Sequence, residues 1–405
     1  MTPCLICGHP IEPFMSFGRM PIANGFLTPD QFAAEPFFEL ATGFCGACKM
    51  VQLTELVDPH KMFHENYAFF SSTSTRMAAH FQALADGISR HHLGPDPFVV
   101  EIGSNDGILL RHFASAGIRH LGIEPSANVA AAARLNGVTT ISEFFNEALA
   151  ERIVAEHGQA DVFVGANVMC HIPTLHGVVA GVGRLLKQKG VMIFEDPYLG
   201  DILEKTSYDQ IYDEHAFYFS VTSLDHLFAR HGLEIVDVDP QSTHGGSMRY
   251  TVGRVGEHPS SEQTKRQRAR EVALGIGEPA TYDAFRRRVE RSRVELMDLL
   301  RDLKARGKRV TGYGATSKST TVTNYCGITP ELVEFISDTT PIKQGKFSPG
   351  AHIPIRPSAE FRARYPDYAL LFAWNHADEI RANERAFIEA GGQWVVYVPR
   401  VGVEK

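Results

Sequence analysis

Short apolar runs alternate with amphipathic stretches through the middle of the chain, from residue 97 to about residue 255. Such runs are typical of buried parallel strands, and apolar positions three and four residues apart are typical of helices. The predicted strands are Phe98–Ile102, Arg119–Ile123, Asp161–Ala166, Val191–Phe194, Glu234–Val238 and Met248–Val252. The predicted helices are Ile108–Ala116, Ala127–Asn136, Asn146–Glu156, Pro173–Leu186 and Leu224–His231. This alternation predicts one α/β domain on a doubly wound sheet.

The same alternation returns near Lys308, after a highly charged stretch over residues 256–307. Two helices predicted in that stretch, Glu262–Gly275 and Tyr282–Ala305, form a helical connection between the two parts of the chain. Beyond it we predict a strand that ends near Gly312, strands at Val333–Ser337, Tyr368–Phe372 and Gln393–Tyr397, and a helix at Ala377–Ala390. Residues 308–405 therefore form a second, smaller Rossmann-like domain in this prediction.

Four of the six cysteines form two Cys-x-x-Cys pairs near the N-terminus. The pairs are Cys4 with Cys7 and Cys45 with Cys48. Two such turns bring four thiolates into a tetrahedron, which describes a structural Zn²⁺ site with no open coordination position. A redox pair and unrelated buried cysteines are the alternatives. The spacing favours zinc, so residues 1–65 are predicted to be a zinc-binding module that precedes a core over residues 66–255.

Composition and charge narrow the classes of partner. The chain has 405 residues, 44% of them hydrophobic and 21% charged, and a net charge of −7. These values are typical of a globular protein and argue against a general nucleic-acid-binding surface. No apolar run approaches the roughly 18 residues of a membrane span, and no secretory signal is visible. We therefore expect a cytoplasmic protein that binds neither nucleic acid nor membrane.

The first strand of the core runs into a turn with a glycine at each end. Its sequence, Glu101-Ile102-Gly103-Ser104-Asn105-Asp106-Gly107, lacks the third glycine of a dinucleotide loop and carries acids instead. It resembles the S-adenosylmethionine (SAM) loop of class I methyltransferases. Glu124 ends the next strand, where a ribose-binding carboxylate falls in such units. We predict that Glu101, Gly103, Asn105, Asp106 and Glu124 bind SAM, with another nucleotide or an ordinary βα turn as alternatives.

Two further segments are expected on the cofactor side of this core. Asn167 and His171 follow the strand Asp161–Ala166, at the edge of the sheet where ligands bind in this fold. His171 has an alternative role as a packed structural histidine. Tyr67 and Ser72 belong to a segment rich in aromatic and hydroxyl side chains before the core. They either face SAM or belong to a loop that caps the next helix.

A run of proton-handling side chains follows the fifth strand. Tyr212, Glu214 and His215 lie in the sequence Tyr212-Asp213-Glu214-His215. Acids, a histidine and aromatics beside a cofactor domain favour acid–base chemistry, although a charged surface segment is the alternative.

Two glycine loops are predicted to hold an anionic substrate. The first is His244-Gly245-Gly246-Ser247 with nearby Arg249, where backbone N–H groups and a guanidinium suit a phosphate. The second is Gly312-Tyr313-Gly314 with Lys318 one turn into the following helix. A nucleoside diphosphate is the expected ligand of the second loop, and NAD or a purely structural role are the alternatives.

Taken together, these motifs resemble the sugar C-methyltransferases that act on nucleotide-activated 4-keto-deoxysugars. The similarity also includes Gly122-Ile123-Glu124-Pro125-Ser126 and Asn324-Tyr325-Cys326-Gly327, and it extends over nearly the whole chain. It implies a zinc module, a SAM-binding core and a C-terminal domain that helps to hold the nucleotide sugar. It also implies that Tyr212, Glu214, His215 and His171 line the reaction centre, and that His244, Ser247, Arg249, Tyr313, Lys318 and Asn324 bind the sugar nucleotide.

The resemblance leads to an expected reaction: methyl transfer from SAM to C3 of a dTDP- or GDP-linked 4-keto sugar by a monomeric enzyme. One departure, Thr316-Ser317-Lys318-Ser319, stands where relatives often have a Pro-Ala-Lys-Gly type of loop, and it leaves the nucleotide open. We predict that His215 removes the C3 proton, assisted by Tyr212 and by Glu214 or another acid that holds the ring tautomer. Tyr212 or a water molecule is the alternative base. An NAD-dependent oxidoreductase and a non-catalytic binding module are the alternative functions.

Overall fold

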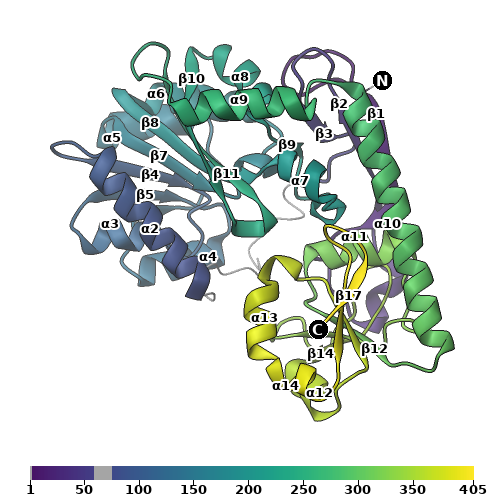
Figure 1. The fold of residues 1–405 in the computed structure, drawn as a ribbon. Helices are drawn as coiled ribbons and strands as arrows, with labels where there is room; N and C mark the ends of the chain where they lie inside the picture. Colours follow the sequence, from purple (N-terminus) through teal and green to yellow (C-terminus); the bar gives the residue numbers. More distant parts are fainter. Residues whose placement is uncertain (1, 59–74) are drawn as a thin grey trace.

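The computed structural model describes residues 2–58 and 75–405, and it contains three β-sheets. Figure 1 shows the large central sheet with helices on both of its faces, the small N-terminal sheet beside it, and the C-terminal domain below both. One continuous hydrophobic cluster includes side chains from all three parts, among them Met15, Phe194 and Leu370. The predicted fold class, a small N-terminal unit followed by a doubly wound α/β core and a smaller C-terminal α/β domain, is confirmed.

The N-terminal sheet has the strand order β1-β2-β3-β9. Strands β1 (Glu12–Pro21), β2 (Phe37–Phe44) and β3 (Val51–Leu53) form an antiparallel meander, with the short helix η1 (Pro29–Ala34) between β1 and β2. The fourth strand, β9 (Phe217–Tyr218), comes from the core and pairs antiparallel with β3. The sheet therefore joins the N-terminal module to the segment that follows His215.

The central sheet has the strand order β10-β11-β8-β7-β4-β5-β6. Its parallel part comprises β4 (Phe98–Ile102), β5 (Arg119–Ile123), β6 (Thr140–Ile141), β7 (Ala160–Ala166) and β8 (Leu186–Pro197). The antiparallel edge comprises β10 (Leu233–Gln241) and β11 (Ser247–Arg254). The strand order reverses at β4, so the turn after β4 lies at the topological switch where ligands bind in this fold.

Helices cover the central sheet between its strands. They are α2 (Thr75–His91), α3 (Leu110–Ser115), α4 (Ala127–Leu135), α5 (Glu147–His157), α6 (Leu175–Leu185), α7 (Leu199–Lys205) and α8 (Val221–Ala229). Helix α5 begins at Asn146, whose side chain accepts a hydrogen bond from the Leu149 N–H, and ends before Gly158. Strand β8 is longer than predicted at both ends, because the polar residues Lys187–Lys189 and Glu195–Asp196 continue the strand without an apolar signal.

The C-terminal sheet has the strand order β14-β13-β12-β15-β16-β17. Its strands are β12 (Val310–Tyr313), β13 (Ile336–Asp338), β14 (Ile355–Pro357), β15 (Tyr368–Leu371), β16 (Gln393–Val396) and β17 (Gly402–Glu404). Its helices are α11 (Ser317–Cys326), α12 (Ser358–Ala363), α13 (Ala377–Asn383) and α14 (Arg385–Glu389). The single helix predicted over 377–390 is interrupted at Glu384, whose buried carboxylate binds Arg362 and Tyr313 instead.

Two helices connect the core to the C-terminal domain. Helix α9 (Glu262–Leu274) and the long helix α10 (Pro279–Ala305) agree with the predicted connection. In Figure 1, α10 runs along the N-terminal module down to the C-terminal domain. Its buried face, which includes Phe285, Val289 and Leu296, packs against both. Helix α10 therefore links the N-terminal module to the C-terminal domain by packing against both.

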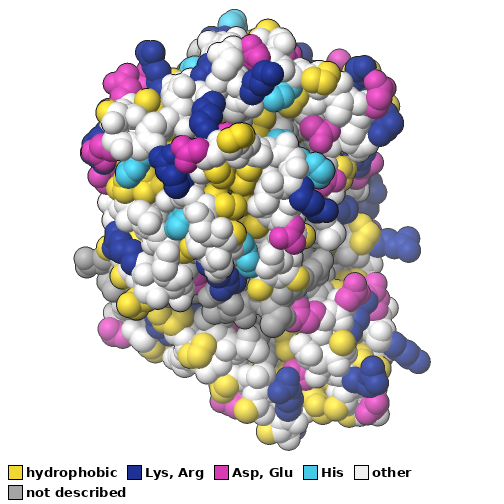
Figure 2. All heavy atoms as spheres, turned by 90° about the vertical axis from the view of Figure 1, so that its left-hand side faces the viewer, with side chains coloured by type: hydrophobic (Ala, Val, Ile, Leu, Met, Phe, Trp, Pro, Cys, Tyr) yellow, Lys and Arg dark blue, Asp and Glu magenta, His cyan; other side chains and the backbone are white. Residues whose placement is uncertain are grey.

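Within the described part of the chain, no helix combines the length and apolar character that crossing a membrane requires. Figure 2 shows basic and acidic side chains interspersed over one face of the molecule, without an extended patch of either sign on that face.

Candidate functional site

The four N-terminal cysteines lie together as predicted. Their Sγ atoms all lie within 4.8 Å of one another. The Cys4–Cys48 and Cys7–Cys45 Sγ distances are both 3.4 Å, close to the edge of about 3.8 Å that a tetrahedron with Zn–S bonds of about 2.3 Å requires. A hydrogen bond between the two thiols lowers the pKa of Cys4 and raises that of Cys48. The donor set and spacing fit a closed structural Zn²⁺ site.

The turn after β4 adopts a conformation that its two glycines make possible. Gly103 and Gly107 have φ values of +63° and +80°. A Cβ on Gly103 would lie 2.8 Å from Val168, and one on Gly107 would lie 2.7 Å from Val138. The glycines therefore allow this loop to pack tightly against its own core.

Carboxylates surround this turn. Glu124 follows β5, and its two oxygens accept hydrogen bonds from the Asn105 N–H (3.0 Å) and the Ser126 N–H (2.8 Å). Glu101 is buried, and its Oε2 has no hydrogen-bond partner among the described residues. Burial raises the pKa of Glu101 well above its usual range, and the nearby charges of Glu124 and Asp106 raise it further. Burial also raises the pKa of Glu124.

These carboxylates suit SAM, whose ammonium and sulfonium groups are cationic and whose ribose offers hydroxyl donors. Asn167 lies on the same side, directly after β7, and its Nδ2 is 3.0 Å from His244 Nε2. The structure therefore brings together Asn167, which we predicted on the SAM side, and His244, which we predicted to bind the sugar nucleotide. Tyr67 and Ser72 lie outside the described residues.

A cluster of rings lies at the predicted reaction centre. The His215 ring centroid is 5.1 Å from that of His171 and 4.1 Å from that of Tyr212. His215 Nδ1 lies 2.8 Å from the Gln210 carbonyl oxygen. Because a carbonyl only accepts, Nδ1 carries the proton and Nε2 has a free lone pair. Burial holds the pKa of His215 well below its usual range and lowers that of His171 to about 4, so both rings are neutral near pH 7.

Glu214 does not orient the His215 ring, contrary to the prediction. Its Oε1 accepts a hydrogen bond of 2.6 Å from Asn24 Nδ2, a residue of the N-terminal module. The Gln210 carbonyl takes the orienting role instead. Backbone carbonyls carry no sequence signature, so sequence reasoning had no means to find this one. Burial, with the Asp213 charge, raises the pKa of Glu214 to about 7.

Lys318 is a buried cation beside the same cluster. It belongs to the first turn of α11, where its Nζ donates to Asn375 Oδ1 (3.1 Å) and to the His244 carbonyl (3.4 Å). Burial lowers the pKa of Lys318 to about 8, although the charge of Asp209 raises it. The helix N-terminus and this ammonium group together favour an anion.

Lys343 is a second, partly buried cation, which sequence reasoning missed. Its Nζ donates to the Ala315 carbonyl (2.9 Å) and lies 5.0 Å from the centre of the Phe26 ring. Burial lowers its pKa, while Asp338 and Glu214 raise it. It follows no glycine loop or other motif, and only the tertiary fold brings it near Glu214.

Like His244 and Lys318, the other four predicted substrate-binding residues have protein partners. Arg249 pairs with Glu195 (2.6 Å) and Asp239 (3.3 Å), so its charge is already compensated. Ser247 Oγ donates to the Thr243 carbonyl, Tyr313 OH donates to Glu384, and Asn324 Nδ2 donates to the Thr320 and Pro349 carbonyls. These bonds orient the four side chains within the fold, and direct substrate contact by Ser247, Arg249, Tyr313 and Asn324 stays a prediction.

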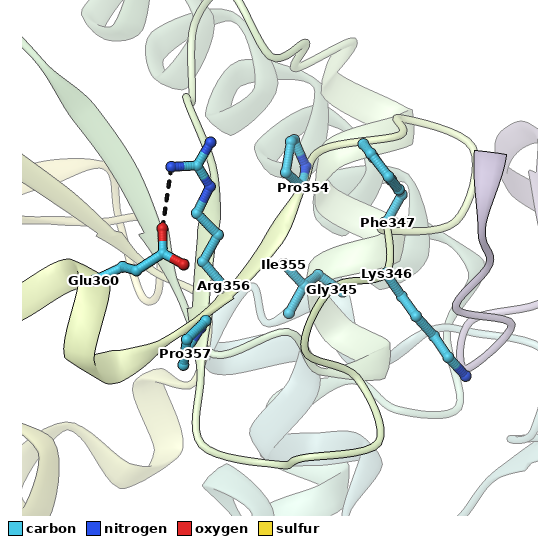
Figure 3. Close-up of a pocket in the computed structure, with 8 residues that line it drawn as sticks. All are labelled: Gly345, Lys346, Phe347, Pro354, Ile355, Arg356, Pro357 and Glu360. Atoms are coloured by element: carbon cyan, nitrogen blue, oxygen red, sulfur yellow. Dashed lines mark hydrogen bonds and ion pairs between the residues drawn. The ribbon is translucent and has the colours of Figure 1, made fainter.

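A surface hollow of about 290 Å³ lies elsewhere, beside β14 in the C-terminal domain (Figure 3). Arg356 and Glu360, which line it, form an ion pair of 3.2 Å with each other. The close-up shows Lys346 extending away from this pair. None of the predicted site residues lines this hollow.

Comparisons with known proteins agree with this arrangement. Three family descriptions match in sequence: "Putative zinc binding domain" over residues 4–63, "Methyltransferase domain" over 76–238, and "C-methyltransferase C-terminal domain" over 242–399. The curated protein "C-methyltransferase NovU" from Streptomyces niveus is 37% identical over 400 residues, which cover 98% of this chain and 95% of NovU.

Solved structures resemble part of the chain. Magnesium protoporphyrin IX methyltransferase from Synechocystis PCC 6803, with bound SAM, is 16% identical with a TM-score of 0.33, and the match covers 44% of this chain and 79% of that one. A SAM-dependent methyltransferase from Anabaena variabilis is also 16% identical, with a TM-score of 0.34 and coverages of 42% and 84%. These similarities are too slight to bear on the substrate.

Proposed function

This chain belongs to the family of SAM-dependent C-methyltransferases with an N-terminal zinc-binding domain, and we propose that it methylates C3 of a nucleotide-activated 4-keto-deoxysugar. Membership of this family displaces the two alternative functions, a nicotinamide-dependent oxidoreductase and a non-catalytic module. The sugar substrate and the carbon that is methylated are our proposal.

The observation that carries the proposal is the state of His215. Its Nδ1–H is held by the Gln210 carbonyl, and its lowered pKa keeps Nε2 unprotonated near neutral pH. An imidazole that is oriented in this way, with an unprotonated Nε2, can accept a proton from carbon. Carbon needs such a base before it can take a methyl group, whereas a hydroxyl oxygen is already nucleophilic.

In the proposed reaction, a ketone at C4 makes the proton on C3 acidic. His215 Nε2 accepts this proton, and the C3–H electron pair moves into the enolate. Tyr212 or His171 donates a hydrogen bond to the enolate oxygen. SAM, when bound by the acidic turn after β4, supplies the electrophilic methyl group. The enolate electron pair would then form the new C3–CH₃ bond as the S–CH₃ bond breaks and S-adenosylhomocysteine leaves, and His215 returns its proton to solvent.

The charges around Lys318 support a substrate that carries a diphosphate. Lys318 lies at the first turn of α11, and Lys343 lies near Glu214. Neither forms an ion pair shorter than 4.0 Å within the described residues, so each can pair with a phosphate group. A dTDP- or GDP-linked sugar has the required charge. The His244 ring and Asn167 lie between this basic region and the SAM turn.

The test combines a substrate screen with an exchange measurement. The enzyme is incubated with SAM and with dTDP- or GDP-linked 4-keto-deoxysugars, and mass spectrometry is used to detect the gain of one methyl group. Deuterium wash-in at C3 without SAM, followed by NMR, then isolates proton removal. His215→Asn is expected to slow wash-in by about 10²–10⁴-fold.

The matched control is His226→Asn, the same substitution at an exposed histidine of α8. It is expected to leave both rates unchanged. If His215→Asn slows methyl transfer but not wash-in, His215 is not the base, and Tyr212 or a water molecule takes that role. If no 4-keto sugar gains a methyl group, the proposed substrate class is wrong.

A further inference from the structure

We propose that the zinc-binding domain takes part in the reaction through Asn24, a positioning residue that holds the Glu214 carboxylate at the reaction centre. This inference rests on the proposed function, because it assigns Asn24 to the site that contains His215. It would make the domain part of the catalytic apparatus in addition to its role in folding.

The first supporting observation is the strand pairing after His215. Strand β3 of the zinc-binding domain pairs with β9, through Val51 opposite Tyr218 and Gln52 opposite Phe217. The Leu53 N–H also donates to the carbonyl of Ala216, the residue next to His215 (3.0 Å). The backbone that follows the proposed base is therefore an edge strand of the zinc-domain sheet.

The second observation is a pair of contacts before His215. The Ala23 N–H donates to Asp213 Oδ1 (2.9 Å), and Asn24 Nδ2 donates to Glu214 Oε1 (2.6 Å). Asp213 and Glu214 are 2% and 7% exposed, whereas Asn24 is exposed. Asn24 therefore contacts the buried carboxylate from its solvent side. The segment 213–218 is held on both flanks by the zinc-binding domain.

The third observation concerns the loop that carries Asn24. The Ala23 carbonyl accepts a hydrogen bond from Thr320 Oγ1 of α11 (2.8 Å). Leu27 and Phe347 exchange backbone hydrogen bonds of 3.3 and 2.9 Å. The loop is thus fixed to the C-terminal domain as well, and Asn24 has a defined position between the two domains that flank the reaction centre.

The cysteine cluster is close to these contacts along the chain and in space. Gln52 of β3 accepts a hydrogen bond from the Leu5 N–H, which lies between Cys4 and Cys7 (2.9 Å). Cys48 precedes β3 by only a short turn. Both cysteine pairs therefore connect directly to the strand that holds segment 213–218, and bound Zn²⁺ would keep that strand in place.

The charge state of Glu214 makes the inference measurable. The hydrogen bond from Asn24 favours the ionised carboxylate, whereas burial and Asp213 favour the protonated form. Lys343 also faces Glu214 and favours ionisation, and buried Cys170 lies near it. Losing the Asn24 donor therefore raises the pKa of Glu214. If ionisation of Glu214 affects the rate, the pH–rate profile of the parent has a limb near pH 7. In Asn24→Ala this limb moves to higher pH.

The experiment uses the full-length, zinc-loaded enzyme with Asn24→Ala, Asn24→Gln and Ser16→Ala. Asn24→Ala is expected to lower kcat by about 10- to 100-fold, as small displacements at a reaction centre do, with little change in KM. The Glu214 limb should move to higher pH. Asn24→Gln keeps an amide donor and should restore the parent pH profile in part. Ser16→Ala removes an exposed hydrogen bond to Glu39 in the same domain and should match the parent.

A substrate-free measurement separates this inference from the proposed function. Hydrogen–deuterium exchange by mass spectrometry should show faster amide exchange in the peptide around residues 211–219 of Asn24→Ala. If the parent methylates no 4-keto sugar, the proposed function fails, but the exchange result can still be read. An unchanged pH profile in Asn24→Ala, or a lower kcat that Asn24→Gln shares fully, overturns the role of Asn24.

Discussion

The carboxylate of Glu124 offers the sharpest test of the SAM site. The perturbations are Glu124→Ala, which removes the carboxylate, and Glu124→Gln, which removes one oxygen and the charge. In the structure each oxygen of Glu124 accepts one backbone N–H from the loop, Asn105 on one side and Ser126 on the other. Because each oxygen has two lone pairs, one acceptor position on each is left for the two ribose hydroxyls of SAM.

The expected magnitude follows from these two positions. A hydrogen bond to a charged group contributes about 1.5–3 kcal/mol. Losing two of them in Glu124→Ala costs about 3–6 kcal/mol, which weakens SAM binding by about 10²–10⁴-fold. Glu124→Gln retains one acceptor oxygen and is expected to lose about half of that free energy. The affinity for SAM is therefore expected to be highest for the parent, lower for Glu124→Gln and lowest for Glu124→Ala.

Isothermal calorimetry with SAM measures these affinities, and titration of the same variants with the nucleotide sugar is the internal control. Burial raises the pKa of Glu124, and only the ionised carboxylate can accept both ribose hydroxyls, so SAM affinity should rise as the pH rises through that pKa. Equal SAM affinities for the parent and Glu124→Ala would refute the assignment of the ribose to this carboxylate. Equal losses for both ligands would indicate a general folding defect.

Three further predictions concern other parts of the molecule. Cys45→Ser should lose bound Zn²⁺, measured by atomic absorption, and lower the melting temperature; full metal content with unchanged melting would contradict the zinc site. Lys318→Met should weaken nucleotide-sugar binding by about 10- to 100-fold, the value of one charged hydrogen bond, without changing the calorimetric affinity for SAM. Gly107→Ala should destabilise the protein by about 2–5 kcal/mol in urea unfolding, since φ is +80° and a Cβ would lie 2.7 Å from a valine methyl group. Gly117 has a φ of +69°, but a Cβ there would have no neighbour within 4 Å. Gly117→Ala should therefore lower the free energy of unfolding only through backbone strain. Equal losses of stability at both positions would show that the clash with Val138 is not the cause.

Features that depend on residues close together in sequence could be predicted from the chain alone. The strand Phe98–Ile102 was predicted with its observed bounds because a fully buried parallel strand is a continuous apolar run. The cysteine pairs were predicted because each Cys-x-x-Cys turn brings its own thiolates together. The SAM turn and Glu124 were predicted from glycine spacing and strand order, and the family resemblance followed from these motifs.

Hydrogen bonds and ion pairs between side chains that are distant in sequence could not be predicted in this way. Arg249 looked suited to a phosphate, but the antiparallel pairing of β8 and β11 places Glu195 opposite it. Tyr313 follows a glycine, but its hydroxyl reaches a carboxylate 71 residues further along the chain. Neither pairing leaves a local pattern, because strand register and helix packing determine which distant side chains meet.

At the proposed reaction centre, too, the residue types could be predicted from the sequence, whereas their contacts could not. The sequence by itself identified His215 and its neighbours as proton-handling groups, since their residue types carry that chemistry wherever they lie. Only the tertiary structure determined which carbonyl fixes the imidazole tautomer, and that Asn24 contacts Glu214 across 190 residues of chain. A chemical group is encoded by one residue, but its orientation and charge state depend on burial and on partners that only folding brings within hydrogen-bond distance.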